Sequence, residues 1–458
     1  MGKYQAYTEY TTSNAAWLDE YPSHWKLTQV KYGYQVVLGK MLQKSPKSSV
    51  DSIKPYLKAQ NIQPKGMDIS RVDSMWFSPE ELHKLRLQKG DVLVSEGGDV
   101  GRSAIWNDEL AECYIQNAIN RVRPLGQNCS RYFNYWIGSL KSSDFINILC
   151  NKATIAHYTA EKLEASPLLL PSSVEQTQIA NFLDHETAKI DTLIEKQQQL
   201  IKLLKEKRQA VISHAVTKGL NPQAPMKDSG VEWLGEVPEH WGISSLGYYA
   251  SLNTGATPDR SNLSYWEGDI PWIKTGEVKY ETIYNTEESI SKFAINQTSV
   301  QLSPPGTLLM AMYGQGVTRG RVAILGVHAT YNQACVAITP NSHLFNEYLK
   351  VFFIAGYHAI RDGGNETSQM NLNADIVRKF KVTAPPIDEQ KDIVSFLESE
   401  LPRFDVLLEK ADKAIKLMQE RRTALISAAV TGKIDVRHFT LKDGQAPISE
   451  YQAMEQTV

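Results

Sequence analysis

The chain has 458 residues and a mass of 51.5 kDa, about three times the ~150 residues of an average domain, so we expect two to four folded units. Its composition, with 42% hydrophobic and 22% charged residues, is that of a folded globular protein and excludes a disordered or fibrous one. The balance of 49 basic and 51 acidic residues argues against a protein that coats nucleic acid indiscriminately, so any binding charge must be local.

The cysteines and the apolar runs bear on the cellular compartment. The four cysteines lie far apart and never form a C-x-x-C pair, which argues against a zinc site or a disulfide framework and favours a reducing cytoplasm. The N-terminus has no apolar signal segment, and the longest apolar run, residues 351–360, is half a membrane span. We therefore expect neither export nor membrane insertion.

The sequence repeats itself. Residues 17–25 recur as residues 233–241, a shift of 216 positions. Residues 175–217 match residues 389–431 without a gap, at a shift of 214. Matches of this length predict an internal duplication, and two copies of one unit predict pseudo-twofold symmetry.

Each copy has a mixed front part and a helical rear part. In the front parts, short β-type runs such as residues 91–94 and 321–325 are separated by Gly and Pro, which is typical of α/β globules. We expect a first globule over residues 1–170, a helix over 171–219, a linker with a second globule over 220–384, a second helix over 385–432, and a tail over 433–458.

Both rear parts carry apolar residues with a seven-residue period, which predicts amphipathic helices. The residues expected to pack are Leu183, Ile190, Leu204, Val211, Leu397, Phe404, Met418 and Leu425. One such stripe would fit an ordinary core-facing helix, but two in matched register favour helices that pack against each other. The short linker between the copies predicts that the second helix runs antiparallel to the first, and Pro402 should kink or restart it. The predicted fold class is mixed α/β, with two globules separated by a pair of long antiparallel coiled-coil helices.

No catalytic signature is found in the chain. The glycines of residues 97–103 lack the lysine and the spacing of a phosphate-binding loop, which argues against ATP hydrolysis. Asp269, Glu277 and Lys279 approximate the spacing of metal-dependent nucleases, in which two carboxylates hold Mg²⁺. Because the first copy has neither carboxylates nor lysine at the equivalent positions, a structural role is favoured. We expect no catalytic residue and no metal site.

His24 and His240 occupy equivalent positions in the two copies, each directly before a tryptophan. No acidic residue with catalytic spacing accompanies either histidine in the sequence. We therefore interpret both as packing residues rather than as bases or metal ligands.

A basic stretch between His24 and Lys65 contains eight lysines and one acid, with tyrosines among them. Lysines of this kind contact phosphates, and the interleaved aromatic and polar groups can reach base edges. The alternative is a lysine face that is only solvated. The second copy carries a glycine-rich loop over residues 313–321, whose counterpart in the first copy contains Arg102. The residues expected to contact DNA are Lys44, Lys47, Lys54, Tyr56, Lys58, Arg102, Lys274, Tyr313, Gln315, Arg319 and Arg321.

Several runs resemble the conserved regions of type I restriction–modification specificity subunits. They lie at residues 175–183, 205–212, 216–222 and 226–241. The resemblance covers nearly the whole chain. It implies two target recognition domains that each read half of a bipartite, asymmetric DNA sequence, with conserved helices that set the spacing between them. The base-reading residues of this family vary among members, so none is carried over.

The resemblance also implies a non-catalytic subunit that works in a complex in the prokaryotic cytoplasm. The expected partners are double-stranded DNA, two adenine methyltransferase subunits and, in systems that have them, two motor and endonuclease subunits. S-adenosylmethionine, ATP and Mg²⁺ are expected on those partners, with no cofactor in this chain. A stand-alone two-headed DNA-binding scaffold is the alternative function.

Overall fold

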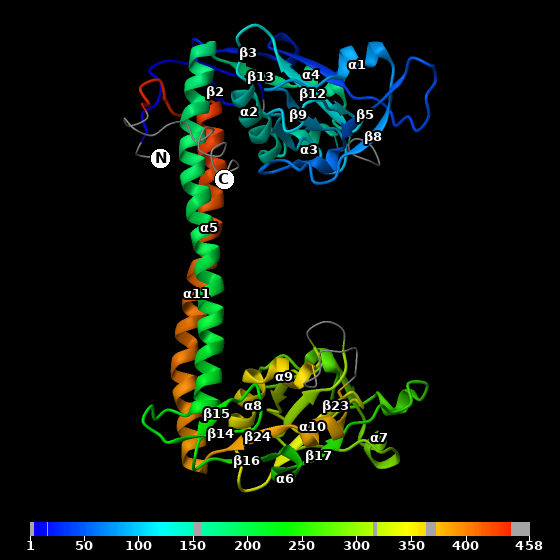
Figure 1. Cartoon of the computed structure of the whole chain (residues 1–458), viewed down its shortest axis with the longest axis vertical. Coiled ribbons are helices and arrows are strands. Elements are labelled where there is room, and N and C mark those ends of the chain that lie inside the picture. The colour runs from blue at the N-terminus through cyan, green and yellow to red at the C-terminus, as the bar shows by residue number, and fades with distance from the viewer. Residues whose placement is uncertain (1–3, 16, 151–156, 315–317, 363–371, 441–458) are drawn as a thin grey trace. The chain divides into compact units, whose positions relative to one another are not determined.

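The computed structural model describes residues 4–15, 17–150, 157–314, 318–362 and 372–440. The chain divides into two compact units, the first of residues 1–197 with 413–458 and the second of residues 198–412. The divisions fall inside two long helices, α5 (Ser173–Lys218) and α11 (Ile387–Val430). Each helix therefore contributes one part to each unit (Figure 1).

The first unit is built from short strands and short helices. Its strands are β1 (Tyr10–Thr12), β2 (Glu20–Pro22), β3 (Lys26–Gln29), β4 (Tyr34–Leu38), β5 (Ser52–Leu57), β6 (Ile62–Gln63), β7 (Gly66–Met67), β8 (Asp73–Phe77), β9 (Val92–Ser95), β10 (Ser103–Ile105), β11 (Tyr114–Ile115), β12 (Ile119–Pro124) and β13 (Pro167–Leu170). Its shorter helices are α1 (Pro79–Leu85), α2 (Ser130–Ser142), α3 (Phe145–Cys150) and α4 (Ala160–Ala165), with 3₁₀ turns η1 (Val30–Tyr32) and η2 (Ala59–Asn61).

Two sheets organise the first unit. The antiparallel main sheet has the strand order β10-β9-β12-β4. A second sheet has the order β11-β5-β8, in which β11 is parallel to β5 and β8 is antiparallel to it. The segment between β4 and β9 therefore leaves the main sheet, forms most of the second sheet and returns.

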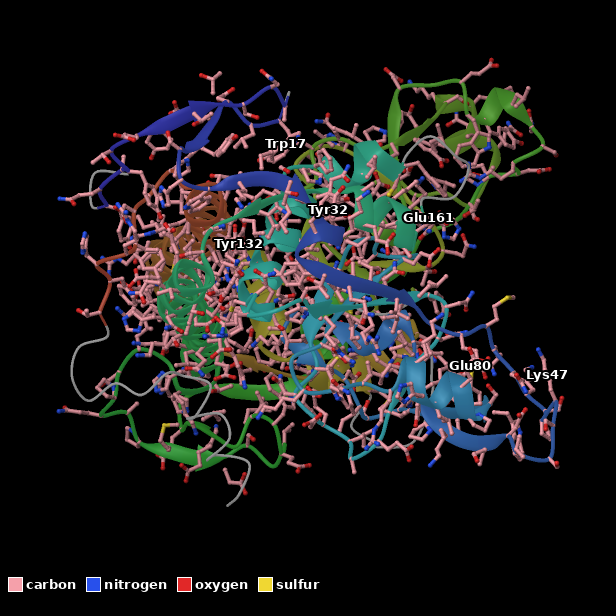
Figure 2. All side chains as sticks on the ribbon, turned by 90° about the horizontal axis from the view of Figure 1, so that it is seen from above. Trp17, Tyr32, Lys47, Glu80, Tyr132 and Glu161 are labelled. Atoms are coloured by element: carbon pink, nitrogen blue, oxygen red, sulfur yellow. The ribbon has the colours of Figure 1, made fainter. Side chains whose placement is uncertain are left out.

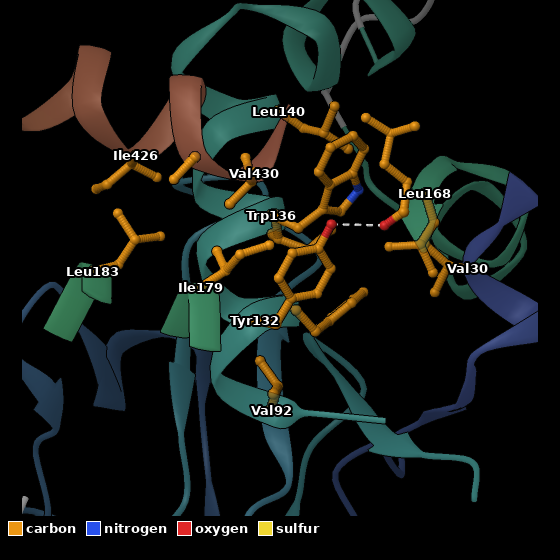
Figure 3. Packing of buried hydrophobic residues seen from close by; sticks show 14 of the residues in the cluster. Val30, Val92, Tyr132, Trp136, Leu140, Leu168, Ile179, Leu183, Ile426 and Val430 are labelled. Atoms are coloured by element: carbon orange, nitrogen blue, oxygen red, sulfur yellow. Dashed lines mark hydrogen bonds between the residues drawn. The ribbon is translucent and has the colours of Figure 1, made fainter. Parts of the chain in front are cut away.

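The core of the first unit lies between α2 and the long helices. Tyr132 and Trp136, one helical turn apart on the same face of α2, are buried with Ile179 and Leu183 of α5 and Val430 of α11 (Figure 3). Burying several large apolar side chains in one place provides the main favourable free energy for docking the sheet domain onto the helices. Within this unit the early part of α5 thus packs beside the late part of α11.

The second unit has its own set of strands and helices. The strands are β14 (Met226–Asp228), β15 (Glu236–Pro238), β16 (Gly242–Ser245), β17 (Ala250–Thr254), β18 (Ile270–Ile273), β19 (Glu288–Ile290), β20 (Leu308–Ala311), β21 (Val322–Ile324), β22 (Thr330–Tyr331), β23 (Cys335–Pro340) and β24 (Lys381–Ala384). The helices are α6 (Leu246–Tyr249), α7 (Lys292–Gln297), α8 (Asn346–Ala355), α9 (Tyr357–Asp362) and α10 (Ala374–Lys379), with 3₁₀ turns η3 (Leu263–Tyr265) and η4 (Thr275–Glu277).

The sheets of the second unit have the same order as those of the first. The four-stranded sheet has the order β21-β20-β23-β17, and the three-stranded sheet has the order β22-β18-β19, with β22 parallel to β18. The predicted mixed α/β fold is confirmed. Most strands of the two units correspond at the 216-residue shift found in the sequence, whereas the edge strands β21 and β19 are offset from it by a few residues.

The long helices contact each other inside each unit. In the first unit Asp191 of α5 accepts a hydrogen bond from Arg422 Nε of α11 at 2.9 Å. In the second unit Arg208 Nε of α5 donates to Asp405 of α11 at 3.2 Å. In both units an early part of one helix therefore meets a late part of the other. Pro402 lies inside α11, which continues through it as one helix, so the expected restart is wrong.

The heptad residues line these contacts. Leu183, Ile190, Leu397, Phe404 and Leu425 are buried, and three further predicted residues are half-buried: Leu204, Val211 and Met418. A graded burial of this kind is expected where two helices pack without a surrounding domain, because the partner helix covers only one side of each.

Candidate nucleic-acid interface

The predicted basic stretch lies mostly in the segment between β4 and β9 of the first unit. Lys44 and Lys47 are exposed there, and neither forms an ion pair with the residues described. Figure 2 shows Lys47 at the periphery of the molecule, far from Tyr132 in the core. These two lysines are available to a phosphate.

Two other predicted lysines already have carboxylate partners. Lys54 Nζ lies 2.6 Å from Glu112 Oε2, and this hydrogen bond lowers the pKa of Glu112. Lys58 pairs with Asp73, and that contact raises the pKa of Lys58. A phosphate would have to displace a carboxylate to bind either lysine. The excess positive charge of the stretch, as read from the sequence, is partly neutralised by acids from other strands.

A pocket of about 520 Å³ brings three predicted residues together. It lies at the end of the parallel strands β5 and β11 and is lined by Leu42, Lys44, Tyr56, Lys58, Asp73, Ser74 and Gln116. Tyr56 is buried, and burial raises the pKa of its hydroxyl. The pocket thus combines cations, an aromatic ring and an amide, the groups that contact phosphates and base edges. Gln116 was not among the predicted residues.

Arg102 stabilises the loop in which it lies. Its Nη2 donates to the carbonyl oxygen of Ala59 at 3.1 Å, and its Nη1 lies 3.5 Å from Asp99. Lys141 also pairs with Asp99. These contacts fasten the glycine-rich loop of the first unit to η2 and to α2, so the guanidinium of Arg102 has a structural role whether or not it also meets DNA.

Lys274 in the second unit is held by two acids. Its Nζ lies 2.8 Å from Glu287 and 3.0 Å from Glu288, and hydrogen bonding to Glu287 first and Glu288 next raises the pKa of Lys274 to about 12. A lysine between two carboxylates presents no net positive charge to a phosphate.

The predicted loop of the second unit is described in part. Tyr313 packs against the core of this unit, and Arg321 lies with its guanidinium 5.7 Å from the ring centre of Tyr280. Arg319 is half-buried, and Gln315 lies outside the described residues. Tyr313 and Arg321 thus make these contacts within the second unit.

Glu277, one member of the nuclease-like pattern, has a structural role. Glu277 accepts hydrogen bonds from the backbone N–H of Lys274 at 2.7 Å and of Glu287 at 2.9 Å, so its carboxylate caps η4. In the first unit Asn61 accepts from the backbone N–H of Lys58 at 2.8 Å in the same way. An amide performs the same capping where no carboxylate exists, which explains why the repeat tolerates the change. Among the described residues no group of three or more metal-binding side chains occurs.

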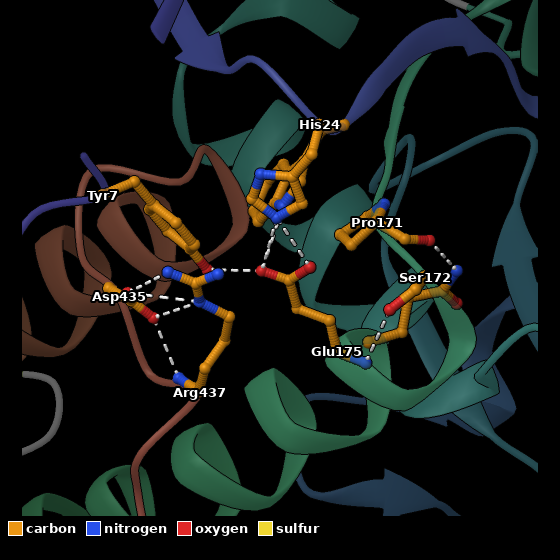
Figure 4. Close-up of polar contacts among 9 residues, drawn as sticks. Tyr7, His24, Pro171, Ser172, Glu175, Asp435 and Arg437 are labelled. Carbon is orange, nitrogen blue, oxygen red and sulfur yellow. Dashed lines mark hydrogen bonds and ion pairs between the residues drawn. The ribbon is translucent and has the colours of Figure 1, made fainter. Parts of the chain in front are cut away.

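His24 has an acidic partner that the sequence did not indicate. The carboxylate of Glu175, at the start of α5, lies 3.1 Å from His24 Nε2, accepts from Trp25 Nε1 at 3.1 Å and accepts from the Tyr7 hydroxyl at 2.7 Å (Figure 4). Burial and the bond to Glu175 raise the pKa of Tyr7. The histidine does pack beside tryptophan, but the interpretation as packing alone is incomplete, because both rings fasten the globule to the long helix.

The second unit repeats this anchor with fewer donors. His240 Nε2 lies 2.8 Å from Glu389, and Trp241 Nε1 donates to the same carboxylate at 3.1 Å. Glu389 stands at the start of α11, as Glu175 stands at the start of α5. We call Glu175 and Glu389, with the rings bound to them, the helix anchors.

The glutamines after these glutamates bind backbone. Gln176 accepts from the N–H of Cys129 at 2.9 Å, before α2, and Gln390 accepts from the N–H of Phe345 at 2.9 Å, before α8. Each Glu-Gln pair therefore holds two separate parts of its domain at the beginning of a long helix. This arrangement fixes the orientation of each domain's sheet on its own helix segment.

Comparison with protein families gives two matches. The model of the type I restriction modification DNA specificity domain matches residues 34–203 and 238–415, which together are more than half of the chain. The chain belongs to this family. The two matches begin in β4 and at the end of β15, and each runs through one globular region into a long helix. The predicted resemblance is therefore confirmed.

The curated relatives are specificity subunits. The MjaIX subunit of Methanocaldococcus jannaschii is 27% identical over 194 residues, which cover 41% of this chain and 43% of that subunit. The EcoR124I/EcoR124II subunit of Escherichia coli is 24% identical, covering 60% and 63%. The EcoKI subunit of Escherichia coli K12 is 22% identical, covering 84% and 83%. The chain thus spans less than two thirds of the first two and most of the third. All three of these relatives are named as specificity subunits.

Two solved structures share the fold. One, from a study of complex assembly and conformational transition in a type I restriction–modification system, has a TM-score of 0.69 at 14% identity and covers 90% of this chain and 99% of that one. The HsdS subunit of Thermoanaerobacter tengcongensis has a TM-score of 0.56 at 13% identity, covering 90% and 98%. No helix among the residues described here is long and apolar enough to cross a membrane.

Proposed function

We propose that this chain recognises a bipartite, asymmetric DNA sequence, with one half read by each globular domain. The observation that carries the proposal is the pair of domains with one strand order and different surfaces. A single scaffold used twice with different contact residues suits two unlike half-sites better than a palindrome. An internal duplication of the gene explains the shared order.

The long helices are proposed to act as the spacer between the two readers. Support comes from the ion pairs Asp191–Arg422 and Arg208–Asp405 and from the heptad residues buried around them. The helix anchors add to this, since each domain is fastened to the beginning of a helix by a buried or half-buried glutamate. We infer an antiparallel coiled coil whose length sets the number of base pairs between the half-sites.

The same helices are proposed to bind two methyltransferase subunits. Large apolar side chains remain exposed on them at matching positions of the two copies: Leu193 with Leu407, and Leu203 with Leu417. Exposed leucines on a helix that already has a partner indicate a surface for another protein. Two equivalent pairs fit two copies of one subunit. S-adenosylmethionine, ATP and Mg²⁺ would then be bound by partners, in the prokaryotic cytoplasm.

Enrichment of a random duplex library by the full-length chain tests the recognition proposal. We expect a two-part site whose halves differ and are separated by a fixed number of unspecified base pairs. Enrichment of a single block, of a palindrome, or of no sequence at all would contradict it.

Co-purification separates the complex from the stand-alone scaffold. The full chain expressed in its host should purify with two methyltransferase chains, and Leu203→Asp with Leu417→Asp should release them while leaving library enrichment intact. A chain that binds its two-part site and purifies without partners would favour the autonomous scaffold.

A further inference from the structure

Each unit places two neighbouring amide side chains in the turn after its short parallel strand. In the first unit the turn is Gln116-Asn117, directly after β11, and in the second it is Asn332-Gln333, directly after β22. We call these the amide turns. Neither pair belongs to the residues predicted from the sequence.

The backbone of the two amide turns is built in the same way. Gln116 N–H donates to the carbonyl oxygen of Leu57 at 3.0 Å, and Asn332 N–H donates to that of Ile273 at 3.0 Å. Leu57 ends β5 and Ile273 ends β18, the strands parallel to β11 and β22. Each amide pair therefore lies at the carboxyl end of two parallel strands.

A glycine packs closely against the backbone of each amide turn. A Cβ added to Gly39 would clash with the carbonyl oxygen of Gln116, and one added to Gly255 would clash with the carbonyl oxygens of Tyr331 and Asn332. No other residue fits at either position without moving backbone. The backbone that follows β4 and β17 thus packs directly against the amide turn in both units.

Each amide turn is also hydrogen-bonded to the glycine-rich loop of its own unit. Glu96 N–H donates to Ala118 O at 2.9 Å, and Met312 N–H donates to Ala334 O at 2.8 Å. These bonds lie at the beginning of the loops that contain Arg102 and Arg321. Each amide turn therefore lies next to the residue at which the loop of its own domain begins.

The amide side chains differ in what they bind. Gln116 lines the pocket with Lys44, Tyr56 and Lys58, and its side chain and that of Asn117 have no hydrogen bond to another described residue. In the second unit Asn332 closes its turn by accepting from Ala334 N–H at 3.1 Å.

Gln333 is the outward member of the second pair. Its side chain is exposed, and its carbonyl oxygen accepts a hydrogen bond from the Thr257 hydroxyl. That bond leaves its amide N–H groups exposed and orients them. Each turn thus holds at least one amide whose hydrogen-bonding groups face outward from a fixed backbone.

We propose that the amide turns read base edges, Gln116 and Asn117 in one half-site and Gln333 in the other, with adenine as the preferred base. Asn and Gln present a donor and an acceptor side by side, which matches N7 and the exocyclic amine of adenine in the major groove. The inference rests on the proposed recognition of DNA and names the residues that perform it. A rigid backbone beneath the amides reduces the entropy lost on contact.

The competing explanation is that the amides only shape their turns. It accounts for Asn332, whose side chain bonds to its own backbone. It does not account for Gln116 and Asn117, whose side chains have no hydrogen bond to a described residue, or for the exposed Gln333. The two explanations differ in what a change of hydrogen-bonding type should do. Replacing an amide with a carboxylate keeps the shape of the side chain but removes its donor.

The test is library enrichment by the full-length chain and its variants. Gln116→Ala with Asn117→Ala should relax an A·T position in one half-site by about 5- to 150-fold, since a bidentate contact is worth ~1–3 kcal/mol of discrimination. Gln333→Ala should relax a position in the other half-site only. Gln60→Ala and Gln297→Ala change exposed amides outside the turns and serve as matched controls.

The carboxylate variants distinguish a change in base preference from a general loss of binding caused by misfolding. Asn117→Asp and Gln333→Glu should move the preference at the affected position from adenine toward cytosine, whose exocyclic amine donates to a carboxylate. Unchanged half-sites in all variants, or an equal loss for every sequence, would overturn the inference while leaving two-part recognition in place. A parent chain that enriches no two-part site would instead contradict the proposed function, and this inference with it.

Discussion

The two globular domains share a scaffold but differ in charge. The segment that leaves the main sheet spans residues 39–91 in the first domain and 255–307 in the second. The first segment has ten basic and six acidic residues, whereas the second has four basic and seven acidic. Equal strand order with opposite net charge shows that the sheets depend on apolar pattern and turns, while the surface is free to vary.

If the chain recognises DNA as proposed, this difference in charge predicts unequal contributions of the two domains to binding. Affinity that does not depend on sequence comes from phosphate contacts, which need free cations. The first domain has them in Lys44 and Lys47, whereas Lys274 of the second is neutralised by two glutamates. We therefore expect the first domain to supply most of the electrostatic affinity and the second to contribute mainly selectivity.

The helix anchors differ as well. The Glu175 side chain is 6% exposed and binds three rings, whereas the Glu389 side chain is 25% exposed and binds two. The additional donor is Tyr7, over which Arg437 stacks at 4.9 Å (Figure 4). Residues of the N-terminal segment and of the segment after α11 thus shield the Glu175 anchor from solvent. Among the described residues, the Glu389 anchor forms with His240 and Trp241 alone.

The largest changes in stability should come from the buried residues that occupy equivalent positions in the two units. Leu183→Ala and Leu397→Ala remove equivalent buried side chains, so each should lower the free energy of unfolding by about 2–5 kcal/mol. Urea unfolding of the full chain measures this, with the exposed Leu203→Ala as control. A cost under about 0.5 kcal/mol at one site only would break the equivalence.

Mutations at the two helix anchors should destabilise the two domains to different extents. Glu175→Ala leaves buried ring donors without an acceptor and should cost about 2–3 kcal/mol, whereas Glu389→Ala, at a more exposed site, should cost about 1 kcal/mol. Calorimetry of the two variants gives the ranking. The Glu→Gln changes keep an acceptor and should be milder, and a reversed ranking would show that exposure does not decide the cost.

Salt dependence sharpens the electrostatic contrast. Lys44→Ala with Lys47→Ala should reduce the slope of log affinity against log salt by about 1–2, because each phosphate contact contributes ~0.9. Lys54→Ala with Lys58→Ala should reduce it less, since both lysines are paired, and Lys274→Ala should leave it unchanged. Titrations at several salt concentrations decide the order. A larger change from Lys274 would place the phosphate contacts in the second domain.

The smallest effects should come from the helix ion pairs. Asp191–Arg422 and Arg208–Asp405 are partly exposed, so double-mutant cycles should give ~0.2–1 kcal/mol for each. Equal values would agree with matched helix contacts in the two units. A coupling above about 2 kcal/mol in either cycle would mean that the pair is far less hydrated than its exposure indicates.

The sequence was most informative where local pattern decides structure. The seven-residue period predicted the long helices, and residues such as Leu183 and Leu397 are buried as the period requires. Alternating short runs and turns predicted the α/β globules. The repeat at fixed shift predicted that both copies share these elements, because equal apolar patterns form equal sheets.

It was least informative where partners lie far apart in the chain. Glu175 is 151 residues from His24, and Glu112 is 58 residues from Lys54, so neither pairing leaves a local pattern. The net charge of the basic stretch was therefore overestimated as a DNA-binding signal. The amide turns have no signature in the sequence, because two adjacent amides are common and only the fold shows that both pairs follow equivalent strands.

The central claim is that one scaffold presents two different readers at a distance set by the helices. Adding one heptad to each helix, after Gln197 in α5 and after Asp412 in α11, lengthens both by ~10.5 Å while keeping the apolar stripe in register. Enrichment by this variant should return the two parental half-sites with a spacer longer by about three base pairs, at ~3.4 Å per pair. Altered half-sites at the parental spacing, or unchanged half-sites and spacing, would contradict the account.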